Sequence, residues 1–431
     1  MKHVVNLGFI SKEFDAFEHS EIFEDETFLD KGFHPNKISD ILHREKEIEG
    51  CMRHLSKALK NIVPGNLLIY GKFGTGKTMI INVLTSELEK IALSRGIRVK
   101  TIYIHCKAVP TNVGVFKFVN HSLSLEMSHE IIKTPNSFDE YFFKFCKLAK
   151  EFKGILVIIL DEIDMLRDPD ILNLFSRLKE SGYLEKNVCV IGITNDIRFD
   201  ERLDGRTKSI LSERTMIFPP YDANQLRDIL FQRAELAFKP GVLEEMIIPI
   251  CAAYAAQEHG DARQALELLR VSGNIAEERR EKKVTEAHVK AAHERIENDK
   301  VTELICTLPL QSKIILAGCI FIYNLDQSKS FTGEIYKQYI EFCKHLDIDV
   351  LTQRRVTDLL SEFSTMGLIH ALEISKGRYG RTKEVSFAVS VKSAWTALME
   401  DYRLKNLSDF NTSKYENYSK KVAASGQLQL F

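Results

Sequence analysis

Eight residues from Gly71 to Thr78, Gly-Lys-Phe-Gly-Thr-Gly-Lys-Thr, constrain the fold of this chain more than any other stretch. They fit the pattern G-x-x-x-x-G-K-[ST] of a phosphate-binding loop. The largely apolar run 66–70 before them predicts a buried strand, and apolar residues recur at helical spacing between 80 and 88 after them. Because a strand, a glycine loop and a helix point backbone N–H groups at phosphate oxygens, the stretch predicts a nucleotide site.

The phosphate-binding loop is expected to contact the nucleotide through all of its residues, which are Gly71, Lys72, Phe73, Gly74, Thr75, Gly76, Lys77 and Thr78. Lys77 is expected to reach the β- and γ-phosphates, and Thr78 is expected to hold Mg²⁺. A chance glycine-rich turn is the alternative, but it does not account for the flanking strand and helix.

Length and composition exclude several classes of protein for this chain. At 431 residues it is expected to form two or three domains, and its net charge of −1 means that any basic surface is local. The eight cysteines lack a C-x-x-C pair, which argues against a zinc site and for reduced thiols. The acidic first thirty residues do not resemble a signal peptide, and the longest apolar run, 155–160, is too short to span a bilayer. A cytoplasmic protein is therefore expected.

Strands and helices alternate after the loop. Residues 99–105, 154–160 and 187–194 are candidate strands, and the stretch 107–150 is largely helical in pattern. This alternation predicts an α/β fold whose parallel sheet is covered by helices on both faces. Ligands of such sheets bind beyond the carboxyl ends of the strands.

Polar residues follow these strands and complete the predicted nucleotide site. Asp161 should hold Mg²⁺, because a hard cation prefers carboxylate oxygen. Glu162 is placed to activate or orient the attacking water, and Asn195 could bond that water or the γ-phosphate. The alternatives are a solvated acidic turn for the two carboxylates and a plain turn residue for Asn195.

A linker and a helical piece follow the predicted core. Pro219 and Pro220 disfavour helix, so the segment that they share with Tyr221 is expected to lead into a second, helical piece. Asp261 is expected to cap the third helix of that piece, which leaves Arg263 in its first turn. Because the helix dipole disfavours a cation there, a phosphate partner for Arg263 is more attractive than simple exposure to solvent.

Three further segments lie outside these motifs. Residues 35–45 include His43 and Arg44 and are followed by an amphipathic helix. Because this stretch lies just ahead of the phosphate-binding loop, it is expected to form a wall on the adenine side of the nucleotide; a plain loop and helix is the alternative. Arg206 lies in a polar loop and is either solvated or supplied to the γ-phosphate of a neighbouring subunit. The acidic residues 1–30 are expected to form an exposed arm.

The carboxyl-terminal part has the pattern of three helices followed by a β-hairpin, which is a winged helix-turn-helix. Apolar residues at helical spacing between 356 and 363 place one face of the third helix on a core. That helix begins with the candidate base-reading residues Gln353, Arg354 and Arg355. The hairpin carries candidate contacts to duplex phosphates or the minor groove, namely Lys376, Arg378, Tyr379, Arg381 and Lys383. A solvated charged hairpin is the alternative.

The chain ends in a polar stretch, 401–425, that is expected to be a flexible tail. The last five residues resemble the Gln-Leu-x-Leu-Phe peptides that dock into sliding clamps. Leu430 and Phe431 could enter an apolar pocket while Gln427 hydrogen-bonds beside it. A frayed terminus is the alternative.

Four motifs, in order along the chain, resemble the series of an AAA+ ATPase. Residues 71–78 look like Walker A, 160–164 like Walker B, 193–196 like sensor 1 and 260–263 like sensor 2. The resemblance extends from about residue 30 to about residue 395.

More narrowly, the chain resembles the archaeal replication initiators related to the origin recognition complex and the cell-division-cycle helicase-loading ATPase. Residues 35–45, 204–221 and 260–270 carry this narrower match. It implies that Arg206 occupies the arginine-finger position and that Arg263 is the sensor 2 arginine. The segment from His105 to Asn120 resembles the helical insertion through which these initiators contact DNA.

The resemblance implies an ATP-dependent initiator that binds origin duplex DNA and helps load the replicative helicase. Its expected cofactors are ATP or ADP and Mg²⁺, and slow ATP hydrolysis would act as a switch. Other initiator subunits and, through the tail, a sliding clamp are further expected partners, at the nucleoid. The expected parts are an arm (1–30), an AAA+ core (31–218), a helical lid (219–300), a winged helix (301–400) and a tail (401–431).

Two other functional classes share parts of this pattern. One is an AAA+ motor or loader, such as a branch-migration helicase or a clamp loader. The other is a nucleotide-sensing DNA-binding regulator.

Overall fold

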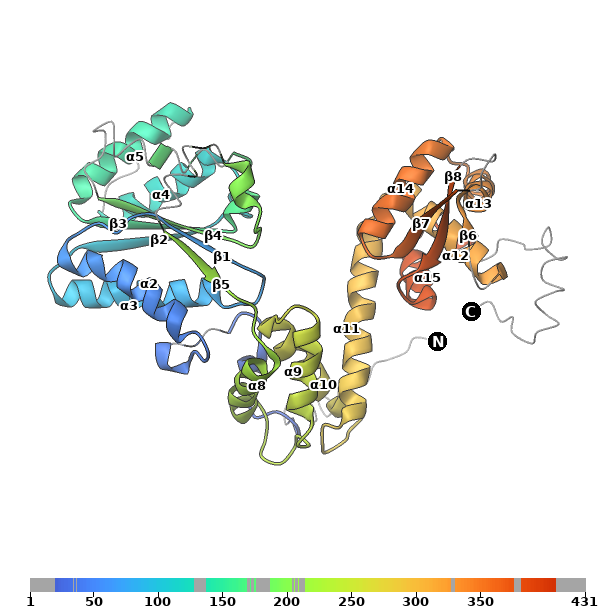
Figure 1. Ribbon diagram of the computed structural model, residues 1–431, viewed down its shortest axis with the longest axis horizontal. Helices are drawn as coiled ribbons and strands as arrows, with labels where there is room; N and C mark the ends of the chain where they lie inside the picture. Colours follow the sequence, from blue (N-terminus) through green and yellow to red (C-terminus); the bar gives the residue numbers. More distant parts are fainter. Residues whose placement is uncertain are drawn as a thin grey trace, which may run out of the picture. The chain divides into compact units, whose positions relative to one another are not determined.

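A computed structural model describes most of the chain. The described residues are 20–33, 35, 37–127, 137–168, 171, 174–175, 187–203, 205, 208, 214–326, 330–375 and 381–407. They form two compact units, Met1–Lys290 and Ala291–Phe431, each of which is treated by itself (Figure 1).

A five-stranded parallel sheet forms the centre of the first unit. Its spatial order is β2-β3-β4-β1-β5. The strands are β1 (Leu67–Gly71), β2 (Val99–His105), β3 (Ile155–Asp161), β4 (Val188–Thr194) and β5 (Thr215–Phe218). Every residue of β1, β3 and β4 is buried, as expected for strands with helices over both faces. The predicted parallel α/β core is therefore confirmed.

Helices cover both faces of this sheet. Figure 1 shows α2 and α3 on one face and α4 and α5 on the other. These helices are α2 (Glu45–Leu55), α3 (Lys77–Ser94), α4 (Asn112–Glu126) and α5 (Phe138–Phe152). The apolar positions predicted to face the core after the phosphate-binding loop are all buried, namely Ile80, Ile81, Leu84 and Leu88. The helix that starts at Lys77 is thereby fixed on the sheet, which places the loop at the carboxyl end of β1.

The second part of the first unit is a helical lid. It contains α8 (Ala223–Ala237), α9 (Ile247–Gln257), α10 (Ala262–Glu278) and the start of α11 (Glu286–Thr307). Asp222 and Gln225 form a capping box at the start of α8. The predicted cap at Asp261 is confirmed, since its Oδ1 accepts a hydrogen bond from the Arg263 N–H over 2.8 Å. The expected domain boundary near residue 300 falls inside α11.

Residues 20–30 pack against the lid, so the prediction of an exposed arm is wrong for this segment. Ile22, Phe23 and Leu29 are buried, and the Phe23 ring centre lies 4.7 Å from that of Phe238. The Lys239 N–H donates to the Ile22 carbonyl over 3.0 Å. The three apolar side chains are interspersed among acidic ones, and their burial on the lid outweighs the acidic composition of the segment. Residues 1–19 lie outside the described residues.

The second unit is the predicted winged helix. Its helices are α12 (Leu310–Asp326), α13 (Thr332–His345), α14 (Gln353–Thr365) and α15 (Val391–Met399). An antiparallel sheet of order β6-β8-β7 completes it, formed by β6 (Ser330–Phe331), β7 (Ile369–Ser375) and β8 (Arg381–Phe387). The predicted core face of α14 is buried, namely Val356, Leu359, Leu360 and Phe363. Gly367, with φ +75°, follows the end of α14 and lets the chain turn into β7.

Short 3-10 turns connect these elements. They are η1 (Glu26–Leu29), η2 (Ile38–Asp40), η3 (Ser56–Lys60), η4 (Ile163–Met165), η5 (Phe199–Arg202) and η7 (Lys405–Leu407). All eight cysteines are free thiols, as expected. Of the helices in the described part of the chain, none combines the length and the apolar character needed to cross a membrane.

Candidate nucleotide-binding site

The phosphate-binding loop has the backbone shape that its glycines allow. Gly74 and Gly76 have φ values of +66° and +88°, in the left-handed region that favours glycine. A Cβ added to Gly74 would lie 1.6 Å from Oδ1 of Asp261 in the lid. The loop therefore touches the lid at a position where only a glycine fits, and it leaves a cradle of the kind that holds phosphate.

Lys77 is buried at the start of α3 and reaches across the end of the sheet. Its Nζ donates to the carbonyl oxygens of Gly71 and Lys72, both over 2.7 Å, and to Oδ1 of Asn195 over 2.8 Å. The pKa of Lys77 is lowered to about 8, mainly by burial; the charge of Asp161 opposes this shift and that of Arg263 adds to it. The structure thus brings together Lys77 and Asn195, which the sequence assigned to one site.

Asp161 is held by three donors at the end of β3. Its Oδ2 accepts from Oγ1 of Thr78 over 2.7 Å and from the hydroxyl of Tyr103, and its Oδ1 accepts from the Glu162 N–H over 2.9 Å. The Thr78 hydroxyl and the Asp161 carboxylate are neighbouring hard oxygen ligands, so their chemistry fits Mg²⁺. Both residues were assigned to the metal from the sequence.

Tyr103 was not predicted as a site residue, although a signal for it was present. It lies near the carboxyl end of the predicted strand 99–105, and the carboxyl ends of such strands line ligand sites. Burial, followed by its bond to Asp161, raises the pKa of the Tyr103 hydroxyl, which therefore stays protonated as a donor.

Glu162 follows Asp161 in an unusual backbone conformation. Its φ of +52° lies in the left-handed region, which a residue with a Cβ adopts at a cost of about 1–3 kcal/mol. Nδ1 of His105, at the end of β2, lies 3.6 Å from Oε2 of Glu162. His105 is a second residue that the rule of strand ends could have found.

The end of β4 is fixed by Thr194, which is fully buried. The Thr194 Oγ1 donates to Oδ1 of Asp164 over 2.7 Å and accepts from the Asp196 N–H over 3.0 Å. These bonds hold both sides of Asn195, so its amide oxygen is fixed facing the Lys77 ammonium.

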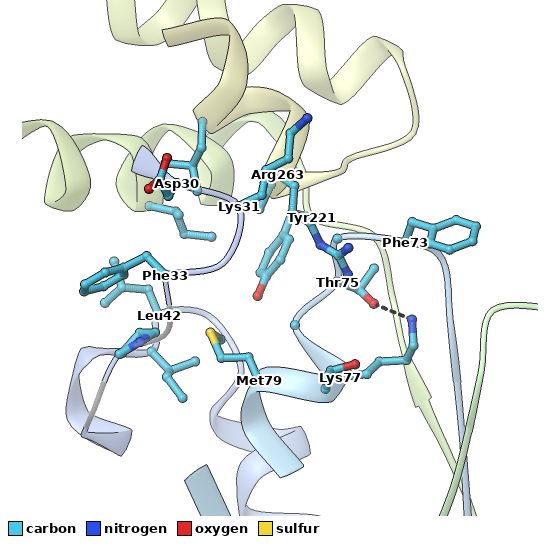
Figure 2. Close-up of a pocket in the computed structure, with 18 of the residues that line it drawn as sticks. Asp30, Lys31, Phe33, Leu42, Phe73, Thr75, Lys77, Met79, Tyr221 and Arg263 are labelled. Carbon is cyan, nitrogen blue, oxygen red and sulfur yellow. Dashed lines mark hydrogen bonds between the residues drawn. The ribbon is translucent and has the colours of Figure 1, made fainter. Parts of the chain in front are cut away.

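A cavity of about 280 Å³ lies between the core and the lid of the first unit (Figure 2). The loop, Asp161, Glu162 and Asn195 line one end of it. Arg263 and Tyr221 line it from the lid side, and Figure 2 shows the Arg263 side chain directed toward the loop. The Ala262 N–H also lies 3.4 Å from the Gly74 carbonyl, so the start of α10 touches the loop directly.

The other end of the cavity is mostly apolar. Its apolar lining comes from four segments far apart in the sequence and consists of Phe33, Pro35, Ile41, Leu42, Met79, Ile229 and Leu266. The Arg233 guanidinium lies 4.4 Å from the Phe33 ring centre, and burial lowers the pKa of Arg233. An apolar cavity end beside a phosphate loop suits a nucleotide base. No local pattern marks Phe33 or Arg233, because only folding brings them together.

His43 and Arg44 are not among the residues that line this cavity, so their direct contact with the cofactor stays a prediction. Arg44 is 1% exposed and donates from Nε to the Thr75 carbonyl over 3.1 Å. Nε2 of His43 lies 3.0 Å from Oδ2 of Asp228 in the lid. Both side chains therefore serve contacts within the protein.

The loop residues differ in how they meet the cavity. Gly71 and Lys72 are not among its lining residues, and they offer their carbonyl oxygens to Lys77. Phe73 lines the cavity but is 54% exposed, and Figure 2 shows its ring pointing away from the other labelled side chains.

The predicted DNA contacts are only partly described. Gln353 and Arg354 are exposed at the start of α14, and Nη1 of Arg355 lies 3.2 Å from Oε1 of Glu362. Lys383 Nζ donates to Oγ of Ser361 in α14. The wing candidates Lys376, Arg378 and Tyr379 and the Arg381 side chain lie outside the described residues, as do the arginine-finger candidate Arg206 and the clamp-binding candidates Gln427, Leu430 and Phe431.

Family models match three consecutive parts of the chain. An AAA domain model matches residues 63–203, the "Cdc6 AAA+ ATPase-type lid domain" matches 227–294, and the "CDC6, C terminal winged helix domain" matches 303–397. Among solved structures, the Aeropyrum pernix ORC1 protein in complex with DNA has a TM-score of 0.74 and 39% identity, covering 90% of this chain and all of that one. Cdc6p from Pyrobaculum aerophilum, with a TM-score of 0.55 and 19% identity, covers 88% of this chain and 99% of its own, and it supports the fold alone.

Two curated proteins illustrate the sequence similarity. "ORC1-type DNA replication protein 1" of Methanosarcina mazei is 44% identical over 398 residues, which are 91% of this chain and 94% of that protein. The "ORC1-type DNA replication protein" of Pyrococcus abyssi is 43% identical over 390 residues, or 90% and 92% of the two chains. Since this similarity spans the core, the lid and the winged helix, the chain belongs to the AAA+ family of archaeal ORC1-type DNA replication proteins.

Proposed function

We propose that this chain is a replication initiator that binds origin duplex DNA under the control of bound ATP or ADP. The observation that carries the proposal is the cavity between core and lid, where Lys77, Asp161 and Arg263 converge in a chain that also has a winged helix. The name of the relatives, DNA replication proteins, supports the same function.

The residues of the cavity have the chemistry to bind a nucleoside triphosphate with Mg²⁺. The ammonium of Lys77 and the guanidinium of Arg263 would neutralise phosphate charge, and the N–H groups of the loop would bond the phosphate oxygens. Thr78 and Asp161 would hold Mg²⁺, which when bound supplies further positive charge at the phosphates.

Hydrolysis would depend on two further side chains. Glu162 would orient or activate water, and Asn195 would bond that water or the γ-phosphate. We propose that ATP hydrolysis is slow and that the nucleotide state serves as a switch. The switch is suggested by the contacts between lid and loop, which involve the Ala262 N–H, Asp261 and Tyr221. Such contacts make the lid position depend on what the loop holds.

The winged helix would supply the main DNA contacts. The A. pernix ORC1 protein was solved with DNA, and the exposed start of α14 here offers Gln353, Arg354 and Arg355 to base edges. The wing candidates Lys376, Arg378, Tyr379 and Arg381 would bind phosphate or the minor groove. Lys383 would instead brace the wing on α14, since it bonds to Ser361.

Other partners follow from the family resemblance and the sequence. We propose that the chain helps load the replicative helicase, and that Arg206 acts on a nucleotide bound by another initiator subunit. The terminal residues Gln427, Leu430 and Phe431 would dock into a sliding clamp. With these partners, the protein would act at the nucleoid of the cytoplasm.

Duplex binding with defined nucleotide states tests this function. Fluorescence anisotropy with a labelled duplex should give tighter binding by the wild type in one nucleotide state than in the other. Arg354→Ala should weaken duplex binding by about 1–3 kcal/mol and relax sequence specificity, while leaving ATP affinity unchanged. Lys90→Ala, on the exposed end of α3, is the matched control and should change neither quantity. Equal duplex affinity of the Arg354 variant and the wild type would contradict the winged-helix assignment.

A further inference from the structure

Arg44 lies where the phosphate-binding loop meets the linker into the lid. It precedes α2 and is 1% exposed. Its Nε donates to the Thr75 carbonyl in the loop over 3.1 Å, and its Nη2 donates to the Pro219 carbonyl in the linker over 2.6 Å. One guanidinium therefore bonds two segments that are far apart in the sequence.

The remaining surroundings of Arg44 are aromatic rings and a carboxylate. Its Cζ lies 3.8 Å from the Tyr221 ring centre and 5.9 Å from that of Phe218. Nη1 lies 3.8 Å from Oε1 of Glu47, which supplies the opposite charge. A lysine cannot reproduce this arrangement, because its single ammonium lacks the planar fork that donates in two directions while stacking on a ring.

At the loop, the bond from Arg44 orients a phosphate-binding group. The described chain has no cis peptide bonds, so the Thr75 carbonyl and the Gly76 N–H point in opposite directions. Holding the carbonyl toward Arg44 therefore directs the Gly76 N–H away from it. Backbone N–H groups of such loops are the groups that bond phosphate oxygens.

At the linker, the same guanidinium fixes the entry to the lid. Pro219 and Tyr221 come just before α8, whose cap is Asp222. The Tyr221 N–H lies 3.3 Å from the carbonyl of Gly260, which precedes Asp261 and α10. A shift of the linker would therefore move the starts of both lid helices.

We propose that Arg44 is a positioning residue that couples the conformation of the phosphate-binding loop to the position of the lid. Nucleotide bound at the loop would set the lid through this guanidinium, so Arg44 would transmit the nucleotide state without touching the nucleotide. The inference rests on the proposed nucleotide switch and identifies the residue through which that switch acts.

Arg44→Lys separates this coupling from nucleotide binding. Two quantities are measured in the full chain: the affinity for fluorescent ADP, and hydrogen exchange of α8 amides with and without saturating ADP. The wild type should bind ADP and gain protection in α8. The lysine variant should bind about tenfold more weakly, because charged hydrogen bonds are lost, and should gain no protection in α8 at saturation. Arg53→Lys, an exposed change on α2, is the matched control and should behave like the wild type.

Chemical rescue distinguishes a positioning role from a general loss of packing. Millimolar guanidinium should restore both ADP affinity and α8 protection in Arg44→Ala, whereas equal methylammonium should not. If the alanine variant does not fold, the lysine variant alone decides the question. Protection of α8 by saturating ADP in Arg44→Lys, equal to that in the wild type, would overturn the coupling. Failure of the wild type to bind ADP would instead overturn the proposed nucleotide site.

Discussion

The ammonium of Lys77 donates a hydrogen bond to the side-chain oxygen of Asn195 over 2.8 Å. Lys77 begins the helix after β1 and Asn195 follows β4, and these strands are neighbours in the sheet. The two residues that were assigned to one site from separate motifs therefore meet across adjacent strand ends.

Nucleotide affinity should fall as pH rises above about 8, because burial lowers the pKa of Lys77 to about 8. Bound phosphates stabilise the charged ammonium, so its pKa is higher in the complex than in the free protein. The affinity is then full below the free-protein pKa and falls toward tenfold per pH unit above it. Titrations with fluorescent ADP between pH 6.5 and 9.5 measure this. Lys77→Ala should bind on the order of a hundredfold more weakly with a flat pH profile. A flat profile in the wild type would contradict the role of Lys77.

Glu162→Gln should retain ATP and stop its hydrolysis. The amide keeps the shape of the side chain but cannot accept a proton from water, so turnover should fall by roughly a hundredfold or more. Phosphate release at saturating ATP and equilibrium ATP binding are the two measurements. Glu87→Gln, which changes an exposed carboxylate on α3, is the matched control. Turnover at the wild-type rate in the Glu162 variant would remove this residue from the chemistry.

Gly74→Ala should weaken nucleotide binding more than tenfold, because hydrogen bonds to a charged phosphate depend on the loop. A Cβ there would lie 1.6 Å from Oδ1 of Asp261, so the loop and the lid cannot keep their contact. Gly96→Ala is a matched control, since Gly96 has a similar φ of +69° and open space around it. ADP binding by calorimetry compares the two variants. Equal affinity in both would show that the contact between the loop and the lid is dispensable.

Phe23→Ala should destabilise the lid. Phe23 packs on Phe238, and a Cβ added to Gly273 would lie 2.3 Å from Cζ of Phe23. Truncation of a buried phenylalanine costs about 3–5 kcal/mol of unfolding free energy. The midpoint of the first thermal transition and protease cleavage within the lid both report this loss. Phe231→Ala, on the exposed side of α8, should leave both unchanged. An unaltered transition in the Phe23 variant would mean that residues 20–30 do not brace the lid.

The sequence predicted those parts of the site that follow from local rules. The phosphate-binding loop and the cap at Asp261 are set by short motifs, and Asp161 and Asn195 follow from the positions of strand ends. The same rule applied to the strand 99–105 would also have indicated Tyr103 and His105.

Other features depend on contacts between distant segments. A local pattern does not tell whether the Arg44 guanidinium faces the nucleotide or the protein interior, and its partners Thr75 and Pro219 lie far along the chain. Phe33 and Arg233 meet for the same reason only after folding. The acidic composition of residues 20–30 conceals Ile22 and Phe23, whose burial depends on a lid that the segment itself does not specify.

Selection of bound duplexes from fragmented genomic DNA, with ATP present, tests the central claim most directly. An initiator should recover one repeated element clustered at a few loci, and Arg354→Ala should reduce that recovery. Unselective recovery together with brisk ATP turnover on any duplex would contradict the claim and would indicate an AAA+ motor or loader. Recovery confined to scattered promoters would contradict it in favour of a nucleotide-sensing regulator.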